Sequence, residues 1–167
     1  FKVMHAGATA IGYKDCHTGN MAINSEPRDG RASCVQRGFC FQGCTTGAKW
    51  STLYTEIPRA LATGHVELRP ESQVAAIEHD DRGRVNAVVY FDAEGREQRQ
   101  RARAVAVAGN SIETPRRLLN SASSQFPDGL ANSSGQVGRN YMRHMTGSVY
   151  ASFDEPVHMY RGTTMAG

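Results

Sequence analysis

Residues 104–109 (AVAVAG) limit most narrowly what this chain can fold into. The run is short, apolar and without polar alternation, as in a strand buried on both faces of a parallel sheet. It leads through Asn110 into a helix predicted over residues 113–120, with Pro115 near the first turn and two leucines facing inward. A strand, a tight turn and a helix N-terminus in this order predict an α/β fold with unpaired N–H groups that favour an anion. Many parallel-sheet proteins have such a turn without binding phosphate, so the turn alone leaves nucleotide binding open.

The region before this run predicts a three-stranded antiparallel meander, so the fold is α+β in part. The expected strands are residues 66–68 with 74–77, then residues 84–91, and an exposed strand at residues 96–103. The connecting segments DDRG (80–83) and DAEG (92–95) each place glycine at the end of a short polar loop, which is typical of hairpins. The arginines of the last strand are expected on a solvated face.

Other stretches predict shorter elements. Residues 1–13 have a weak helical stripe and are expected to form a helix ending at Gly12. A second helix is expected over residues 50–61, with Ser51 or Thr52 as the cap and Pro58 near its end. Residues 14–32 predict a loop, and residues 148–153 predict the first strand of another sheet.

Three cysteines, Cys34, Cys40 and Cys44, fall in a C-x5-C-x3-C pattern interleaved with glycines. Glycine lets a backbone turn around a compact centre and bring amide N–H groups to sulfur, which suits an iron–sulfur cluster held by thiolates. Free or structural thiols explain the same spacing, and the metal alternative of zinc lacks a fourth Cys or His at usual spacing. Cys16 and His17 lie in the preceding loop, where the incidental interpretation is the simpler one.

Charge and hydropathy exclude some functions. Nineteen Lys and Arg against sixteen Asp and Glu leave a net charge of +3, and the arginines are dispersed, so no nucleic-acid partner is expected. No apolar run approaches the roughly 20 residues that span a bilayer, so no transmembrane segment is expected in this chain. The chain begins without methionine and ends without a helix stop or polar tail, and we expect it to be an internal piece of a longer protein.

Three separated stretches resemble one family in the same order. They are residues 38–60 (GFCFQGCTTGAKWSTLYTEIPRA), the meander feeding residues 104–123 (AVAVAGNSIETPRRLLNSAS), and residues 133–153 (SSGQVGRNYMRHMTGSVYASF). Together with the meander they cover about three-quarters of the chain. The sequence resembles the glucose-methanol-choline (GMC) oxidoreductases, flavoproteins that oxidise alcohols and sugars with FAD. Within them it is similar to the gluconate dehydrogenase large subunits and FAD-dependent glucose dehydrogenase catalytic subunits.

The resemblance implies an incomplete FAD-binding Rossmann-like domain with the meander inserted into it. The backbone at Val74 is then expected at the adenine, and the turn at residues 108–110 near the adenosine and pyrophosphate. Asn110 stands where glycine is more usual, and asparagine tolerates left-handed backbone geometry best among the other residues. The FAD-binding residues that the resemblance implies are Val74, Ala108, Gly109, Asn110, Thr114, Pro115 and Asn140.

The resemblance also implies a three-iron (3Fe-4S) cluster on Cys34, Cys40 and Cys44, because some members of this branch hold one with this spacing. Many related sequences carry a further cysteine near position 37, where this chain has Arg37. No residue is nominated as catalytic base, since the base and the G-x-G-x-x-G motif are expected outside the chain, and His144 is not the base. The isolated piece is expected to bind FAD poorly and to show no turnover.

The expected domains are a loop-rich cysteine segment (1–50), the central part of the FAD domain (51–145) and the start of the substrate domain (146–167). The leading hypothesis is an FAD-dependent dehydrogenase acting on CH–OH groups of a sugar, sugar acid or alcohol. The implied partners are that small-molecule substrate, a cytochrome c and a small subunit, on the periplasmic side of a bacterial membrane. The alternatives are a GMC-type alcohol oxidase with inert cysteines, and a metal-stabilised binding module without flavin.

Overall fold

The computed structural model describes residues 2–17 and 19–158. The chain divides into two compact units, one formed by Leu68–Gly147 and one that includes the residues before Leu68 and after Gly147. The predicted domain boundaries at residues 50 and 145 concern the complete protein and stay predictions. Among the described helices, none has the length and apolar character that crossing a bilayer requires.

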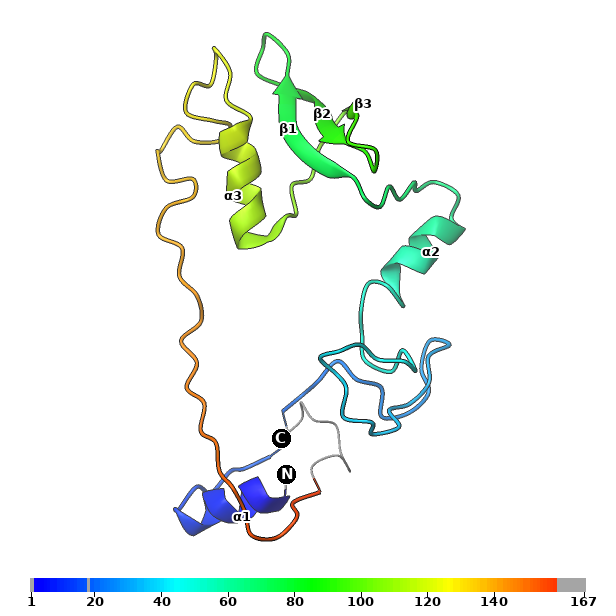
Figure 1. Cartoon of the computed structure of the whole chain (residues 1–167), viewed down its shortest axis with the longest axis vertical. Coiled ribbons are helices and arrows are strands. Elements are labelled where there is room, and N and C mark those ends of the chain that lie inside the picture. The colour runs from blue at the N-terminus through cyan, green and yellow to red at the C-terminus, as the bar shows by residue number, and fades with distance from the viewer. Residues whose placement is uncertain (1, 18, 159–167) are drawn as a thin grey trace. The chain divides into compact units, whose positions relative to one another are not determined.

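The unit Leu68–Gly147 is built on the predicted meander. Strands β1 (Gln73–His79), β2 (Val85–Phe91) and β3 (Glu97–Arg101) form an antiparallel sheet with β2 in the centre, and helix α3 (Asn110–Asn120) lies beside β1 (Figure 1). The register pairs Ile77 with Val88 and Val88 with Gln100, while β1 is irregular at Val74/Ala76 and Glu78/His79. The predicted antiparallel meander is therefore confirmed.

Both hairpins use the same local device. The Asp80 carboxylate accepts the amides of Arg82 and Arg84, each at 2.9 Å, and the Asp92 carboxylate accepts those of Glu94 at 3.1 Å and Arg96 at 2.9 Å. The glycine that closes each loop has a φ of 74°, in the left-handed region. Because one aspartate and one glycine determine each turn, the sequence was sufficient to predict both.

Three predicted strands do not form among the described residues. Residues 66–68, 104–109 and 148–153 are extended or irregular and lie in no strand of the described sheet. A strand exists only when a neighbour supplies the ladder hydrogen bonds, and none of the described segments pairs with these runs. The run 104–109 is also not buried on both faces: its alanines are exposed, whereas Val105 and Val107 are half-buried.

The described helices have bounds that differ from those predicted. Helix α2 is Glu56–Ala62, so Pro58 lies in its first turn and not near its end. Proline is tolerated in the first turn but clashes with the carbonyl four residues earlier, which prevents the helix from including residues 50–54. Helix α3 begins at Asn110, three residues before the predicted start, and includes Pro115 in its interior. The first helix, α1, is Lys2–Ala10, so a helix forms where the sequence predicts one but ends two residues before the expected Gly12.

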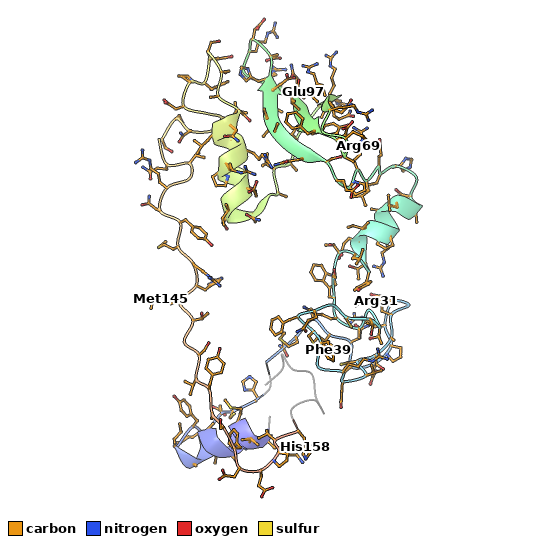
Figure 2. All side chains as sticks on the ribbon, viewed as in Figure 1. Arg31, Phe39, Arg69, Glu97, Met145 and His158 are labelled. Atoms are coloured by element: carbon orange, nitrogen blue, oxygen red, sulfur yellow. The ribbon has the colours of Figure 1, made fainter. Side chains whose placement is uncertain are left out.

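The residues before Leu68 form mainly loops, which hydrogen bonds connect to one another. The Arg31 guanidinium donates to the carbonyls of Gly47 (3.0 Å) and Ala48 (3.3 Å) and to the Asn24 side chain (3.3 Å) (Figure 2). The backbone amide of Asn24 donates to the Ala48 carbonyl at 2.9 Å, and the backbone amide of Cys34 donates to the backbone carbonyl of Asn24 at 2.8 Å. Ala48 is fully buried. Arg31 and Asn24 therefore connect the loop predicted at residues 14–32 to the cysteine segment.

Ser121 connects α3 to β1. Its hydroxyl accepts the Ile77 amide at 2.8 Å and donates to the Arg117 carbonyl at 2.6 Å, and its residue is only 4% exposed. We expect Ser121→Ala to lower the free energy of unfolding of the unit by about 1–3 kcal/mol, because a buried amide loses its acceptor. Hydrogen exchange of the Ile77 amide, followed by NMR, should accelerate.

Ser134→Ala is the matched control for this prediction. The Ser134 hydroxyl accepts the Gln136 amide at 3.3 Å in an exposed loop, so its loss should change stability by no more than about 0.5 kcal/mol. An Ile77 amide that exchanges equally slowly in the Ser121 and Ser134 variants would contradict the assigned role of Ser121.

Candidate functional site

A hollow of about 580 Å³ lies within the unit Leu68–Gly147, against residues 105–109, strand β1 and helix α3. This volume is in the range of small-molecule sites. It is lined by Glu71, Ser72, Gln73, Val74, Ile77, Val88, Val105, Ala106, Val107, Ala108, Gly109, Glu113 and Arg117. Most of these residues are apolar or contribute backbone, and a few polar groups accompany them, as in sites that hold a flat organic ligand.

Two of the polar lining residues, Glu113 and Arg117, belong to an ion-pair group on α3. The Glu113 carboxylate accepts a hydrogen bond from the Arg116 guanidinium at 2.6 Å. It lies 3.2 Å from the guanidinium of Arg117, whose side chain is 15% exposed. The hydrogen bond from the Arg116 guanidinium holds the pKa of the Glu113 carboxyl below its ordinary value. The hollow therefore has a charged carboxylate and a largely covered guanidinium at its helix side.

The segment that enters β1 is also fixed in place. Arg69 donates from one guanidinium nitrogen to the Tyr90 hydroxyl and to the Gln100 side chain, both at 2.9 Å (Figure 2). Arg69 thus ties the start of this segment to β2 and β3. Two residues further on, Glu71 and Ser72 begin the lining of the hollow, so its rim is positioned from the sheet.

The turn into α3 differs from the predicted anion site. Asn110 has a φ of 70°, so it does adopt the left-handed geometry expected of it. Its side-chain oxygen accepts the amides of Ile112 (2.8 Å) and Glu113 (3.1 Å), and the Gly109 amide donates to the Thr114 hydroxyl at 3.0 Å. The prediction of unpaired N–H groups is wrong for these three amides, because the side chains of the turn itself satisfy them.

The structure brings only some of the predicted FAD-binding residues to the hollow. Val74, Ala108 and Gly109 line it, while Asn110 and Thr114 shape the adjoining turn. Pro115 lies inside α3. Asn140 is exposed, has a φ of 58° and donates to the Gln136 side chain at 3.0 Å, away from the lining residues.

The sequence interpretation missed five lining residues with polar side chains: Glu71, Ser72, Gln73, Glu113 and Arg117. A signal was present for two of them, since Glu113 and Arg117 are four residues apart and so share one helix face. Glu71 and Ser72 precede β1 in an irregular segment, and no periodic pattern marks such residues.

The cysteine segment does not form a ready metal site. In residues 2–17 and 19–158, no three His, Cys, Asp or Glu side chains gather closely enough to hold a metal ion. Cys34 accepts the Gln36 amide at 3.4 Å, Cys44 accepts the Lys49 amide at 3.4 Å, and the Cys40 carbonyl accepts the Lys49 ammonium at 2.8 Å. The donors therefore do not fit a three-thiolate cluster in this arrangement, and the predicted metal ligands stay a prediction from spacing.

The Cys44 thiol has a lowered pKa. The Lys49 amide, together with the Thr46 hydroxyl 3.5 Å from the sulfur, lowers the pKa of Cys44 from 9.0 to about 7. Because the thiolate is the nucleophile, alkylation by iodoacetamide should reach half its maximal rate near pH 7. Peptide mass spectrometry across a pH series would measure this midpoint.

Thr46→Val tests the cause of that shift. The substitution keeps the shape of the side chain and removes the hydroxyl, so the alkylation midpoint of Cys44 should rise. Thr45→Val is the control, because the Thr45 hydroxyl accepts a hydrogen bond from the Arg37 guanidinium at 2.9 Å. Equal midpoints in the two variants would contradict the role of Thr46.

The antiparallel sheet, α3 and the hollow beside them are consistent with part of the cofactor domain of a flavin oxidoreductase. Sequence comparison gives the family: the GMC oxidoreductase family matches residues 1–146. The chain belongs to the GMC oxidoreductases, and membership of this family implies FAD as the cofactor.

Curated relatives agree with this assignment. The chain is 38% identical over 123 residues to the fructose dehydrogenase large subunit of Gluconobacter japonicus, covering 74% of this chain and 22% of the relative. It is 38% identical over 125 residues to the 2-methyl-1,2-propanediol dehydrogenase of Mycolicibacterium austroafricanum, with the same coverage of 74% and 22%. It is 32% identical over 157 residues to the paromamine 6'-oxidase of Streptomyces fradiae, covering 93% and 29%. The chain thus spans under a third of the length of these relatives.

Proposed function

We propose that this chain is part of an FAD-dependent dehydrogenase that oxidises CH–OH groups of a sugar, sugar acid or alcohol. One observation supports the proposal beyond family membership: Val74 lines the same ligand-sized hollow as Ala108 and Gly109, which are remote from it in sequence. The names of two relatives at 38% identity, a fructose dehydrogenase and a propanediol dehydrogenase, support a CH–OH donor.

The lining of the hollow fits the adenosine end of FAD better than its phosphates. Val74, Ile77, Val88, Val105 and Val107 offer apolar surface for an adenine ring. A pyrophosphate would need free amides, and those of Gly109, Ile112 and Glu113 already have partners. When bound, the flavin supplies the hydride-accepting chemistry, and the part of these residues is to bind and orient the cofactor.

A Rossmann-like arrangement of the complete FAD domain forms part of the proposal. In it, residues 104–109 are the strand of a parallel sheet whose neighbours come from other parts of the complete protein. The alternating exposed alanines and half-buried valines of this run support the idea, because they leave an apolar, unpaired backbone segment next to the hollow.

The route of the electrons after FAD is a separate question. The C-x5-C-x3-C spacing supports a cluster on Cys34, Cys40 and Cys44, while the arrangement of the described residues does not bring three ligands together. A small subunit and a cytochrome are proposed partners, because one relative is named a large subunit. Iron and sulfide analysis of the anaerobically purified complete protein tests whether a cluster is present.

Anaerobic reduction tests the proposed function. The complete protein, purified with its flavin, should lose flavin absorbance when a sugar or alcohol substrate is added without oxygen. Admitting oxygen then separates a dehydrogenase from the oxidase alternative, because an oxidase restores the flavin absorbance rapidly and releases hydrogen peroxide. A complete protein that contains no flavin would overturn the proposal and favour the metal-stabilised binding module.

A further inference from the structure

A serine and a histidine meet at the end of β1, beside a second hollow. His79 is the last residue of β1, and Ser123 follows α3 in the chain. The distance between His79 Nε2 and Ser123 Oγ is 2.8 Å, and both residues are half-buried. They border a second hollow of about 360 Å³, which includes Glu78, Arg99 and Ser121. Neither residue lines the hollow assigned to the cofactor.

The hydrogen bonds of the ring fix which nitrogen can act as a base. His79 Nδ1 lies 2.8 Å from the Asp80 carbonyl oxygen, which can only accept. In the neutral ring the proton is therefore assigned to Nδ1, and Nε2 presents its lone pair to the Ser123 hydroxyl. The serine proton then points at a base that a third group orients, which is the arrangement that activates serine nucleophiles.

The surroundings hold this pair rigidly. The Phe126 ring packs edge-on against the imidazole, with the ring centroids 4.9 Å apart and the planes at 88°. The Phe126 amide also donates to Ser123 Oγ at 3.1 Å, so the oxygen is fixed from a second direction. By contrast, the neighbouring Ser121 donates its proton to the Arg117 carbonyl at 2.6 Å and has no base for it.

We propose that Ser123 is an activated serine that takes acyl groups from small activated esters, with His79 as its general base. Ser123 Oγ attacks the ester carbonyl and forms a new C–O bond as its proton moves to His79 Nε2. The bond between the acyl carbon and the leaving oxygen breaks, the leaving group departs as its anion, and the imidazolium releases the proton to solvent. The product is an O-acyl serine, and no oxidant or reductant takes part.

The experiment treats the full 167-residue chain with p-nitrophenyl acetate. Release of p-nitrophenolate should show a burst of about one equivalent, with the acetyl group on the peptide that contains Ser123. His79→Gln keeps a hydrogen-bonding side chain and removes the base, so Ser123 acetylation should slow by roughly 100-fold. Ser124→Ala, which removes an exposed hydroxyl next to the pair, should leave the burst unchanged.

Each further outcome decides the proposal. Acetylation of Ser123 at the same rate in His79→Gln would overturn it, as would a burst that persists in Ser123→Ala. If the glutamine variant fails to fold, the unsubstituted chain still provides the test, since acetylation of Ser123 should disappear in concentrated urea. Equal labelling of Ser123 in the folded and urea-unfolded chain would show that the hydroxyl is not activated by the fold.

Discussion

Replacing Gly129 with alanine should lower the free energy of unfolding of the unit Leu68–Gly147 by roughly 3 kcal/mol. Gly129 has a φ of 92°, and a Cβ atom there would lie 2.8 Å from both the Leu118 carbonyl oxygen and the Leu119 Cα. These are backbone atoms of α3, which cannot rotate away. The backbone movement needed to relieve this clash would also disturb the hydrogen bond from the Leu130 amide to the Leu118 carbonyl, which is 2.9 Å long. Hydrogen exchange of the α3 amides measures the loss.

Gly135→Ala separates the clash from the backbone strain. Gly135 has a φ of 67°, and a Cβ atom there would meet nothing within 4 Å. Its replacement should therefore have only the conformational cost, on the order of 1 kcal/mol. If the two variants lost the same stability, close approach of Gly129 to α3 would not be the cause.

Ala108→Leu should weaken FAD binding to the complete protein by roughly tenfold or more, which corresponds to about 1.4 kcal/mol. Ala108 lines the proposed adenosine hollow, and a leucine side chain would occupy part of its 580 Å³. Flavin absorbance after desalting, followed by titration of the flavin-free protein with FAD, measures the change.

Ala93→Leu is the matched control for the cofactor site. Ala93 lies in the exposed hairpin loop between β2 and β3, so the same enlargement there should not alter FAD content. Unchanged FAD affinity in Ala108→Leu, with the protein otherwise flavin-loaded, would mean that FAD binds elsewhere in the complete protein. That result would remove the assigned hollow and leave the family assignment intact.

Local interactions explain which parts of the fold were predictable. The hairpins at Asp80 and Asp92 are formed by side chains that bond amides two and four residues away, so short sequence patterns determine them. The runs 104–109 and 148–153 have strand-like composition, but a strand requires a partner that composition cannot supply. The helix starts differ from those predicted because the Asn110 side chain accepts first-turn amides and α3 begins there, whereas Pro58 delays the start of α2.

The candidate site, like the fold, was predictable only in part. The resemblance directed attention to Val74, Ala108 and Gly109, which the fold brings to one hollow. It could not predict that the Asn110 side chain would take the amides of Ile112 and Glu113. Nor did the spacing of Cys34, Cys40 and Cys44 determine their distances, because loop residues between them set where each thiol lies.

The bond from the Ile77 amide to Ser121 has a consequence for how copies of this chain behave in concentrated solution. β1 is an outer strand, and an outward amide without a partner is a template on which another chain can add a strand and begin to aggregate. The hydroxyl of Ser121, which directly follows α3, accepts a hydrogen bond from the outward Ile77 amide at 2.8 Å. The hydroxyl that stabilises one molecule therefore also protects it from its neighbours, and strand addition along β1 must first displace the end of α3.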